Sequence, residues 1–287
     1  MMRRQPPKHR PIQPWVPQSE VPGRDAASLR YREFAPPPAL ESILVGIWTL
    51  IGSEQGQNTY FYHVVPDGCT DLVYDRGAGE GFIFGTVSAS KTVVMPGDVS
   101  IVGIRLQPHV LQSVTGLPPS EVMNTEPSFT SASVGYLNDL FERYAFPKGQ
   151  PFGKSQVEAL AEAVASMHRP ERINPRAQWL ISALLEGNGS VDRASQTTGF
   201  CTRQLQRIAR QDLGLAPKMF GCILRLQQTF HSILDTNKNQ AHTAALHGYA
   251  DQAHMIREFT RLTGYSPGFW RARKMSDSSN PTALKRA

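Results

Sequence analysis

The feature that most constrains the fold is a pattern that occurs twice between residues 190 and 273. Residues 191–214 read VDRASQTTGFCTRQLQRIARQDLG, and residues 241–264 read AHTAALHGYADQAHMIREFTRLTG. Each copy predicts a short helix, a break at glycine plus an aromatic residue, and a longer helix that ends at glycine. Helix, tight turn and helix is the layout of a helix-turn-helix, whose second helix enters the major groove of DNA. The pattern therefore predicts two such units in one chain.

The longer helix of the first copy, predicted over residues 202–213, separates its apolar and basic residues onto different faces. Its apolar positions recur at helical spacing and predict a buried stripe; they are Leu205, Ile208, Ala209 and Leu213. The other face carries Arg203, Gln206, Arg207 and Arg210. Arginine suits the acceptor edge of guanine, and glutamine suits adenine. We expect this face to contact DNA; an ordinary charged outer face is the alternative.

The longer helix of the second copy, predicted over residues 251–262, has the same design. Met255, Phe259 and Leu262 form its buried stripe, and Asp251 is placed to cap its N-terminus. Its outer face carries Gln252, His254, Arg257 and Arg261, of which His254 has a structural role as its alternative. A helix predicted over residues 217–234 would separate the two units by roughly 27 Å. That length is comparable to the spacing of about 34 Å between successive major-groove faces.

The residues that carry a family resemblance lie in both copies. TRQLQR at 202–207, LGLAPK at 213–218 and Arg225-Leu226 resemble the first half of an AraC/XylS-type DNA-binding domain. GYADQAH at 248–254, REF at 257–259, LTG at 262–264 and the later SP and WR pairs resemble its second half. The resemblance covers the C-terminal part of the chain up to the tail. It implies DNA contacts through Arg203, Gln206, Arg207, Gln252, His254, Ile256 and Arg257.

The first copy departs from the family pattern at three positions. Cys201 stands where a serine usually caps the recognition helix, Arg193 takes a usually apolar place, and Ala209 replaces a large aromatic residue. We therefore expect the first unit to be packed less tightly and to contribute less to base reading.

Short strand-like runs at residues 60–65, 69–74, 81–85, 91–95 and 99–106 predict a small β-barrel or sandwich. The turn at 66–68 (PDG) predicts a hairpin between the first two runs. VPDGCTDL at 65–72, with FG at 84–85 and GIRLQP at 103–108, resembles an uncharacterised sensor-like domain found ahead of some AraC-type modules. This second resemblance implies a cupin-like β fold. We expect a ligand site at the barrel mouth, with structural roles as the alternative, at His63, Asp71, Arg105 and His109.

The chain as a whole is expected to be an α+β protein, with a β-barrel or cupin-like domain followed by an all-α double helix-turn-helix domain. The expected order is a disordered basic, proline-rich leader at 1–25, the sensor-like domain at 26–130, and a helical connector or dimerisation segment at 131–170. The DNA-binding domain follows at 171–275, and a disordered tail at 276–287.

The formal net charge of +6 is unevenly distributed along the 287 residues. Residues 169–287 hold 17 lysines and arginines against 8 acids, whereas residues 25–168 hold 8 against 15. A basic C-terminal part beside an acidic middle is typical of a DNA-binding module joined to a sensing module.

Three widely spaced cysteines without a C-x-x-C pair indicate neither a disulfide framework nor a zinc finger, and they fit a reducing cytoplasm. The histidines at 242, 247 and 254 lack a metal-site pattern, and we expect no metal or cofactor. The basic amino terminus lacks the apolar core of a signal peptide. The longest apolar run, residues 43–51, is too short to span a bilayer.

These features together predict a sequence-specific, DNA-binding transcription regulator without enzymatic activity, whose N-terminal domain senses a small molecule. The expected partners are double-stranded DNA and an unidentified effector, with RNA polymerase and a second copy of the chain as further possibilities and no membrane. The alternatives are a DNA-targeted enzyme, an alkyl-acceptor repair protein that uses Cys69, and a structural DNA-binding protein with a degenerate sensor.

Overall fold

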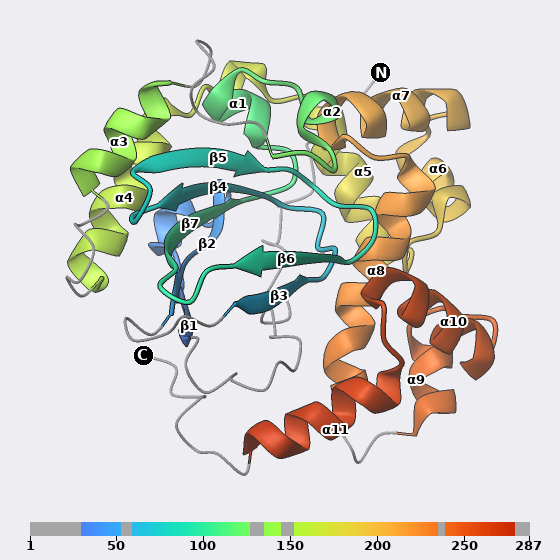
Figure 1. The fold of residues 1–287 in the computed structure, drawn as a ribbon. Helices are drawn as coiled ribbons and strands as arrows, with labels where there is room; N and C mark the ends of the chain where they lie inside the picture. The colour runs from blue at the N-terminus through green and yellow to red at the C-terminus, as the bar shows by residue number, and fades with distance from the viewer. Residues whose placement is uncertain (1–29, 53–58, 127–134, 145–151, 235–238, 279–287) are drawn as a thin grey trace.

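A computed structural model describes residues 30–52, 59–126, 135–144, 152–234 and 239–278. Its N-terminal half is a pair of β-sheets with helices on one side, and its C-terminal half is all helical (Figure 1). The predicted α+β class is confirmed. The leader predicted at 1–25 lies outside the described residues, as does the end of the predicted tail; residues 276–278 belong to the last helix.

Every strand pairing in the N-terminal half is antiparallel. A five-stranded sheet has the order β1-β2-β7-β4-β5, and a two-stranded sheet pairs β3 with β6. The strands are β1 (Arg30–Phe34), β2 (Leu44–Ile51), β3 (Tyr60–Val64), β4 (Thr70–Asp75), β5 (Glu80–Phe84), β6 (Lys91–Met95) and β7 (Ser100–Leu106); a 3-10 turn, η2 (Pro38–Leu40), precedes β2.

The larger sheet is buried on both faces. Strand β7 shows this, because its successive side chains point to opposite faces and every residue is buried. Val102, Ile104 and Leu106 belong to a core shared with the helices that cover the outer face. Ile101 belongs to the core between the two sheets. The covering helices are α1 (Leu111–Thr115), α2 (Pro119–Val122), α3 (Tyr136–Tyr144) and α4 (Lys154–Met167). The sandwich is therefore closed on one side by helices and on the other by β3 and β6.

The hairpin predicted around residues 66–68 is wrong, because β3 and β4 belong to different sheets. The turn carries the chain from one sheet to the other and passes against the C-terminal helices on the way. Gly68 has a φ of +80°, and a Cβ there would lie 2.8 Å from Cε2 of Phe220. A hairpin does form between β4 and β5, where Asp75 accepts a hydrogen bond from the amide of Gly77.

The helical half contains η3 (Pro170–Arg172), α5 (Pro175–Glu186), α6 (Val191–Thr198), α7 (Thr202–Leu213), α8 (Pro217–Leu234), α9 (Gln240–Leu246), α10 (Gln252–Thr263) and α11 (Pro267–Ser278). The helices predicted at 202–213, 217–234 and 251–262 form with nearly the predicted limits. The long α8 serves two separate cores. Phe220 and Ile223 pack with α5, α6 and α7, whereas Phe230 and Ile233 pack with α9, α10 and α11.

The two halves are joined by buried polar contacts as well as apolar ones. Gln227 on α8 donates through Nε2 to the carbonyl of Pro66, at 2.6 Å. Cys69 belongs to the apolar core around α5, α6 and α7, and Val65 to the one around α9 and α10. The turn between β3 and β4 therefore contacts both helix-turn-helix units.

Candidate nucleic-acid interface

Helix α7 is amphipathic as predicted, with Leu205, Ile208, Ala209 and Leu213 buried. Its N-terminus lacks the usual serine cap. Instead the side chain of Gln204 accepts a hydrogen bond from the amide of Cys201, at 2.9 Å. This is the reciprocal half of a capping box, and it pairs one of the amides that a helix start leaves open.

The outer face of α7 brings all four predicted contacts together. Arg203, Gln206, Arg207 and Arg210 are exposed and line a shallow hollow of about 520 Å³. The one acid of the helix, Asp212, is half-buried and accepts a hydrogen bond from Nδ2 of Asn174, at 2.8 Å. The exposed face is therefore basic and free of carboxylates.

Helix α10 repeats this arrangement in the second unit. Asp251 caps it as predicted, accepting a hydrogen bond from the amide of His254 at 2.6 Å. Gln252, Arg257 and Arg261 are exposed, whereas His254 and Ile256 are half-buried.

The imidazole of His254 is engaged within its own unit. Its Nδ1 accepts from the amide of Ala250 at 3.3 Å, and its ring packs edge-on against Tyr249. These contacts let His254 shape the start of the helix.

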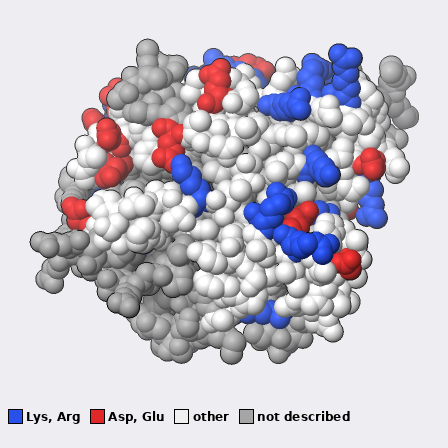
Figure 2. All heavy atoms as spheres, turned by 45° about the vertical axis from the view of Figure 1, so that its right-hand side comes forward, with Lys and Arg blue, Asp and Glu red and all other residues white. Residues whose placement is uncertain are grey.

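The charge asymmetry of the sequence is also an asymmetry of the surface. With the C-terminal helices brought forward, Lys and Arg gather over the right half and Asp and Glu mostly over the left (Figure 2). Exposed arginines contribute to the basic side from both recognition helices: Arg203, Arg207 and Arg210 from α7, and Arg257 and Arg261 from α10. Such a surface attracts a polyanion before any base is read.

A buried ion pair that the sequence analysis did not single out holds α10 to α8. Arg225 donates to both carboxylate oxygens of Glu258, at 2.7 Å each, and its guanidinium lies 4.6 Å from the ring centroid of Tyr249. Cys222 donates its thiol hydrogen to the same carboxylate, at 3.3 Å. The sequence does carry one signal for this ion pair. Glu258 lies three residues after Met255, so helical spacing places its carboxylate on the buried stripe of α10.

The N-terminal domain contacts the C-terminal end of both recognition helices at equivalent glycines. Gly214 ends α7 with a φ of +74°, and a Cβ there would lie 2.9 Å from the carbonyl oxygen of Pro119. Gly264 ends α10 with a φ of +78°, and a Cβ there would lie 3.1 Å from Oγ of Ser90.

Two hydrogen bonds strengthen the contact at α10. The amide of Ser90 donates to the carbonyl of Leu262 at 2.9 Å, and Nε2 of His63 lies 2.6 Å from the carbonyl of Thr263. The β domain thus holds both recognition helices from behind and leaves their outer faces open. The contact of Gly214 with Pro119, and the contacts of residues 262–264 with Ser90 and His63, are together called the C-cap clamp.

The four residues predicted at a barrel mouth occupy different places. Arg105 and Asp71 pair inside the sandwich, through Nε to Oδ1 at 2.9 Å and Nη2 to Oδ2 at 3.0 Å. His63 is part of the C-cap clamp, and Nε2 of His109 accepts from Gln178 on α5, at 3.0 Å. The structure therefore brings two of the four together and sets the other two at the domain boundary.

The buried pair has a further carboxyl beside it. Oδ2 of Asp67 lies 3.4 Å from Nε of Arg105, and its Oδ1 accepts from the amide of Cys69 at 2.8 Å. Burial raises the pKa of Asp67 to about 6, against the opposing charge of Arg105. Nη1 of Arg105 and Nε1 of Trp48 are buried without a hydrogen-bond partner in the described part of the chain.

Cys69 and Cys222 are not in an activating environment. Burial, and then the charge of Asp67, raise the pKa of the Cys69 thiol well above its ordinary value. Burial together with Glu258 raises the pKa of Cys222 to about 11. Both shifts disfavour the thiolate that a nucleophile needs. Among the described residues, no three His, Cys, Asp or Glu side chains gather as a metal site would require.

Comparison with known families assigns the two halves. Residues 194–273 match the family described as helix-turn-helix domain, and residues 32–128 match a domain of unknown function, DUF6597. Residues 194–273 form an AraC-type helix-turn-helix domain. With the AraC-type domain in place, the chain is a DNA-binding transcription regulator. Among curated proteins, none matches the chain.

Solved structures of ToxT from Vibrio cholerae match most of the chain, at low sequence identity. An apo variant from strain SCE256 is 9% identical with a TM-score of 0.41, over 79% of this chain and 97% of that one. A 1.65 Å structure is 7% identical with a TM-score of 0.39, over 85% and 98%. With TM-scores below 0.5, neither ligand nor site is transferred from them. No helix in the described ranges is long and apolar enough to cross a bilayer.

Proposed function

We propose that the regulator reads a specific DNA site through both recognition helices. The contacts would be Arg203, Gln206, Arg207 and Arg210 on α7, and Gln252, His254, Ile256, Arg257 and Arg261 on α10. The supporting observation is that both helices expose arginine and glutamine side chains, while the β domain contacts the C-terminal ends of both. The affinity would come from phosphate contacts, and the specificity from arginine and glutamine on base edges.

The β domain is proposed as the controlling part, which binds a small molecule and changes how the two recognition helices are held. The C-cap clamp supports this proposal, because a shift of the sandwich would move the clamped ends of both helices. A ligand has such an effect only if it binds one arrangement more tightly than another. The segments 26–130, 131–170 and 171–275 are proposed as sensor, connector and DNA-binding domain.

The protein is proposed to be cytoplasmic and to have no enzymatic activity of its own. The raised pKa of Cys69 supports the second point, since an alkyl acceptor needs a reactive thiolate. RNA polymerase and a second copy of the chain are the proposed protein partners. Phe61 and Val94, which pair across β3 and β6 and are both exposed, offer an apolar contact for the second copy. Sedimentation of Val94→Lys against the native chain tests that contact.

The test of DNA reading begins with selection of bound fragments from genomic DNA, followed by fluorescence anisotropy at fixed salt with the selected site and a scrambled duplex. Arg257→Ala should weaken binding to the selected site by about 1–3 kcal/mol and reduce the preference over the scrambled duplex. Arg143→Ala, which removes the same charge from exposed α3, is the matched control. If both variants bind the site as the native chain does, Arg257 is not a DNA contact.

A further inference from the structure

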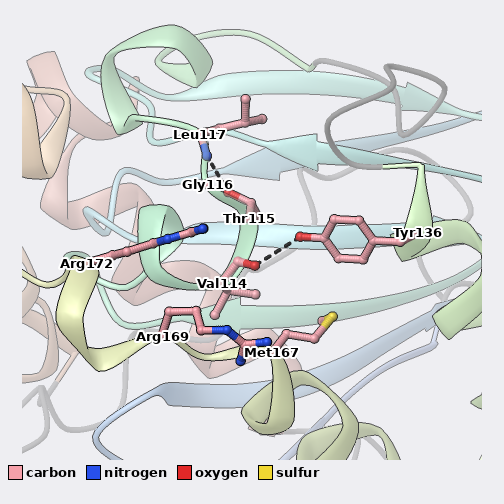
Figure 3. A pocket seen from close by; sticks show the side chains of 8 residues that line it. All are labelled: Val114, Thr115, Gly116, Leu117, Tyr136, Met167, Arg169 and Arg172. Carbon is pink, nitrogen blue, oxygen red and sulfur yellow. Dashed lines mark hydrogen bonds between the residues drawn. The ribbon is translucent and has the colours of Figure 1, made fainter.

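A hollow of about 530 Å³ lies where the β domain meets the connector to the helical half. The end of α1 forms one wall, the first residue of α3 a second, and the segment from the end of α4 through η3 a third (Figure 3). Its volume falls in the range of small-molecule sites. The lining residues are Val114, Thr115, Gly116, Leu117, Tyr136, Met167, Arg169 and Arg172.

Two arginine side chains, Arg169 and Arg172, line the hollow. In the described part of the chain neither Arg169 nor Arg172 has a carboxylate partner. Nη1 of Arg169 is held by the carbonyls of Ser166 and His168, at 3.0 and 3.3 Å, which fixes its direction. Burial raises the pKa of Tyr136, and the charges of Arg172 and Arg169 oppose that rise.

The remaining walls are apolar and preformed. Leu117 and Met167 are half-buried and present apolar surface, and the hydroxyl of Tyr136 donates to the carbonyl of Val114 at 3.0 Å (Figure 3). Gly116 keeps the space open: its φ is +80°, and a Cβ there would lie 3.3 Å from Nη1 of Arg172. Two guanidinium groups beside an apolar wall match an oxyanion headgroup on an apolar body.

The hollow is connected through a few residues to the first recognition helix. Arg172 ends η3, and two residues later Asn174 caps α5 by accepting from the amide of Arg176 at 3.1 Å. The same side chain donates to Asp212 in the last turn of α7, at 2.8 Å. A molecule that draws Arg172 into the hollow therefore acts on the segment that holds the clamped end of α7.

We propose that this hollow is the effector site of the regulator, and that it takes a small organic oxyanion, carboxylate or phosphate, attached to an apolar body. The proposal rests on the proposed control of DNA reading by a small molecule. It places the ligand at the connector, outside the sandwich interior where Asp71 and Arg105 pair.

Binding is tested on the full chain by isothermal titration calorimetry. Cyclohexanecarboxylate and cyclohexyl phosphate supply the headgroup and the apolar body, cyclohexanecarboxamide lacks the charge, and acetate lacks the body. We expect at least one of the two complete anions to bind, and the amide and acetate to bind at least roughly tenfold more weakly. Which complete anion binds more tightly identifies the headgroup. Equal binding of the amide, or no binding of either complete anion, overturns the proposal.

The site is tested by Arg172→Gln, with Arg143→Gln as the matched control on exposed α3. The first variant should lose roughly tenfold or more of its affinity for the complete anion, and the control should keep the native value. Unchanged affinity in Arg172→Gln overturns the site.

Fluorescence anisotropy of the DNA site, measured with and without the bound anion, distinguishes the proposed effector role of the hollow from the proposed DNA reading. A native chain that binds its DNA site equally in both conditions overturns the effector role. A native chain that binds the anion but selects no DNA site overturns the proposed DNA reading, while calorimetry still reports on the hollow.

Discussion

Burial raises the pKa of the Asp67 carboxyl and the charge of Arg105 lowers it, and burial has the larger effect. The pKa of about 6 lies above the ordinary 3.8, so between these values the folded chain holds a proton that the unfolded chain has released. The contribution of this carboxyl to stability is fully present below about pH 4 and is lost as the pH rises through 6. The groups that face it include Arg105, Asp71 and the thiol of Cys69.

Replacing the carboxyl by an isosteric amide tests this dependence. Asp67→Asn keeps the oxygen that accepts from the amide of Cys69 but cannot ionise. Urea unfolding at pH 4.5 and pH 7 should show a smaller loss of stability with rising pH in the variant than in the native chain. Asp139→Asn, on exposed α3, serves as the control. An identical change of stability with pH in native chain and Asp67→Asn would contradict the raised pKa.

At the scale of elements, the second helix-turn-helix unit is joined to α8 by the pair of Arg225 and Glu258. Breaking a buried pair from one side leaves a charge without compensation, which costs about 3–5 kcal/mol. Glu258→Gln should therefore lower the free energy of unfolding by that amount, measured by urea titration. The exposed pair of Lys154 and Glu158 is the control, and Glu158→Gln should cost less than about 1 kcal/mol. Similar losses in both variants would mean that the pair is not buried in solution.

The glycines that end α6 and α7 separate backbone strain from contact with the β domain. Gly199 and Gly214 have nearly the same φ, but only Gly214 has a neighbour within reach of a Cβ, the carbonyl oxygen of Pro119 at 2.9 Å. Gly199→Ala should cost about 1–2 kcal/mol from the left-handed backbone alone. Gly214→Ala should cost clearly more, measured as the free energy of unfolding. Equal losses of unfolding free energy in the two variants would show that the backbone at Pro119 moves away from the new Cβ without destabilising the fold.

The same elements show what periodicity can predict. The limits of α7 and α8 follow from apolar spacing, Pro217 and Gly214, because these signals are local. The partner of β3 was not predictable in this way. The residues at 66–68 are typical of a tight turn, yet Gly68 lies against the ring of Phe220, more than a hundred positions away in the sequence.

Which functional side chains lie together was likewise predictable only for residues on the same helix. The outward face of α7 follows from helix period, so Arg203 and Arg207 could be placed together. The sequence does not show that His63 and Asp71 lie in different sheets, because strands that follow each other in the chain need not pair. His63 instead contacts Thr263, a contact that depends on how the two halves dock.

At the scale of the whole molecule, the β domain contacts the C-terminal ends of both recognition helices. His63→Leu removes one hydrogen bond of the C-cap clamp and should loosen the contact at α10. The amide of Ser90, bonded to Leu262, should then exchange its hydrogen roughly tenfold faster, measured by hydrogen exchange. The amide of Gly79, bonded to Asp75 within its own hairpin, is the internal control. Unchanged exchange at Ser90 would show that His63 does not stabilise the clamp.

The division of α8 between two cores makes the duplicated units inseparable. A fragment truncated after residue 234 would expose Leu226, Phe230 and Ile233, which the second bundle otherwise shields. Such a fragment would expose a continuous apolar surface, and we expect it to aggregate. The second helix-turn-helix unit is therefore needed to cover the apolar side chains of the C-terminal half of α8.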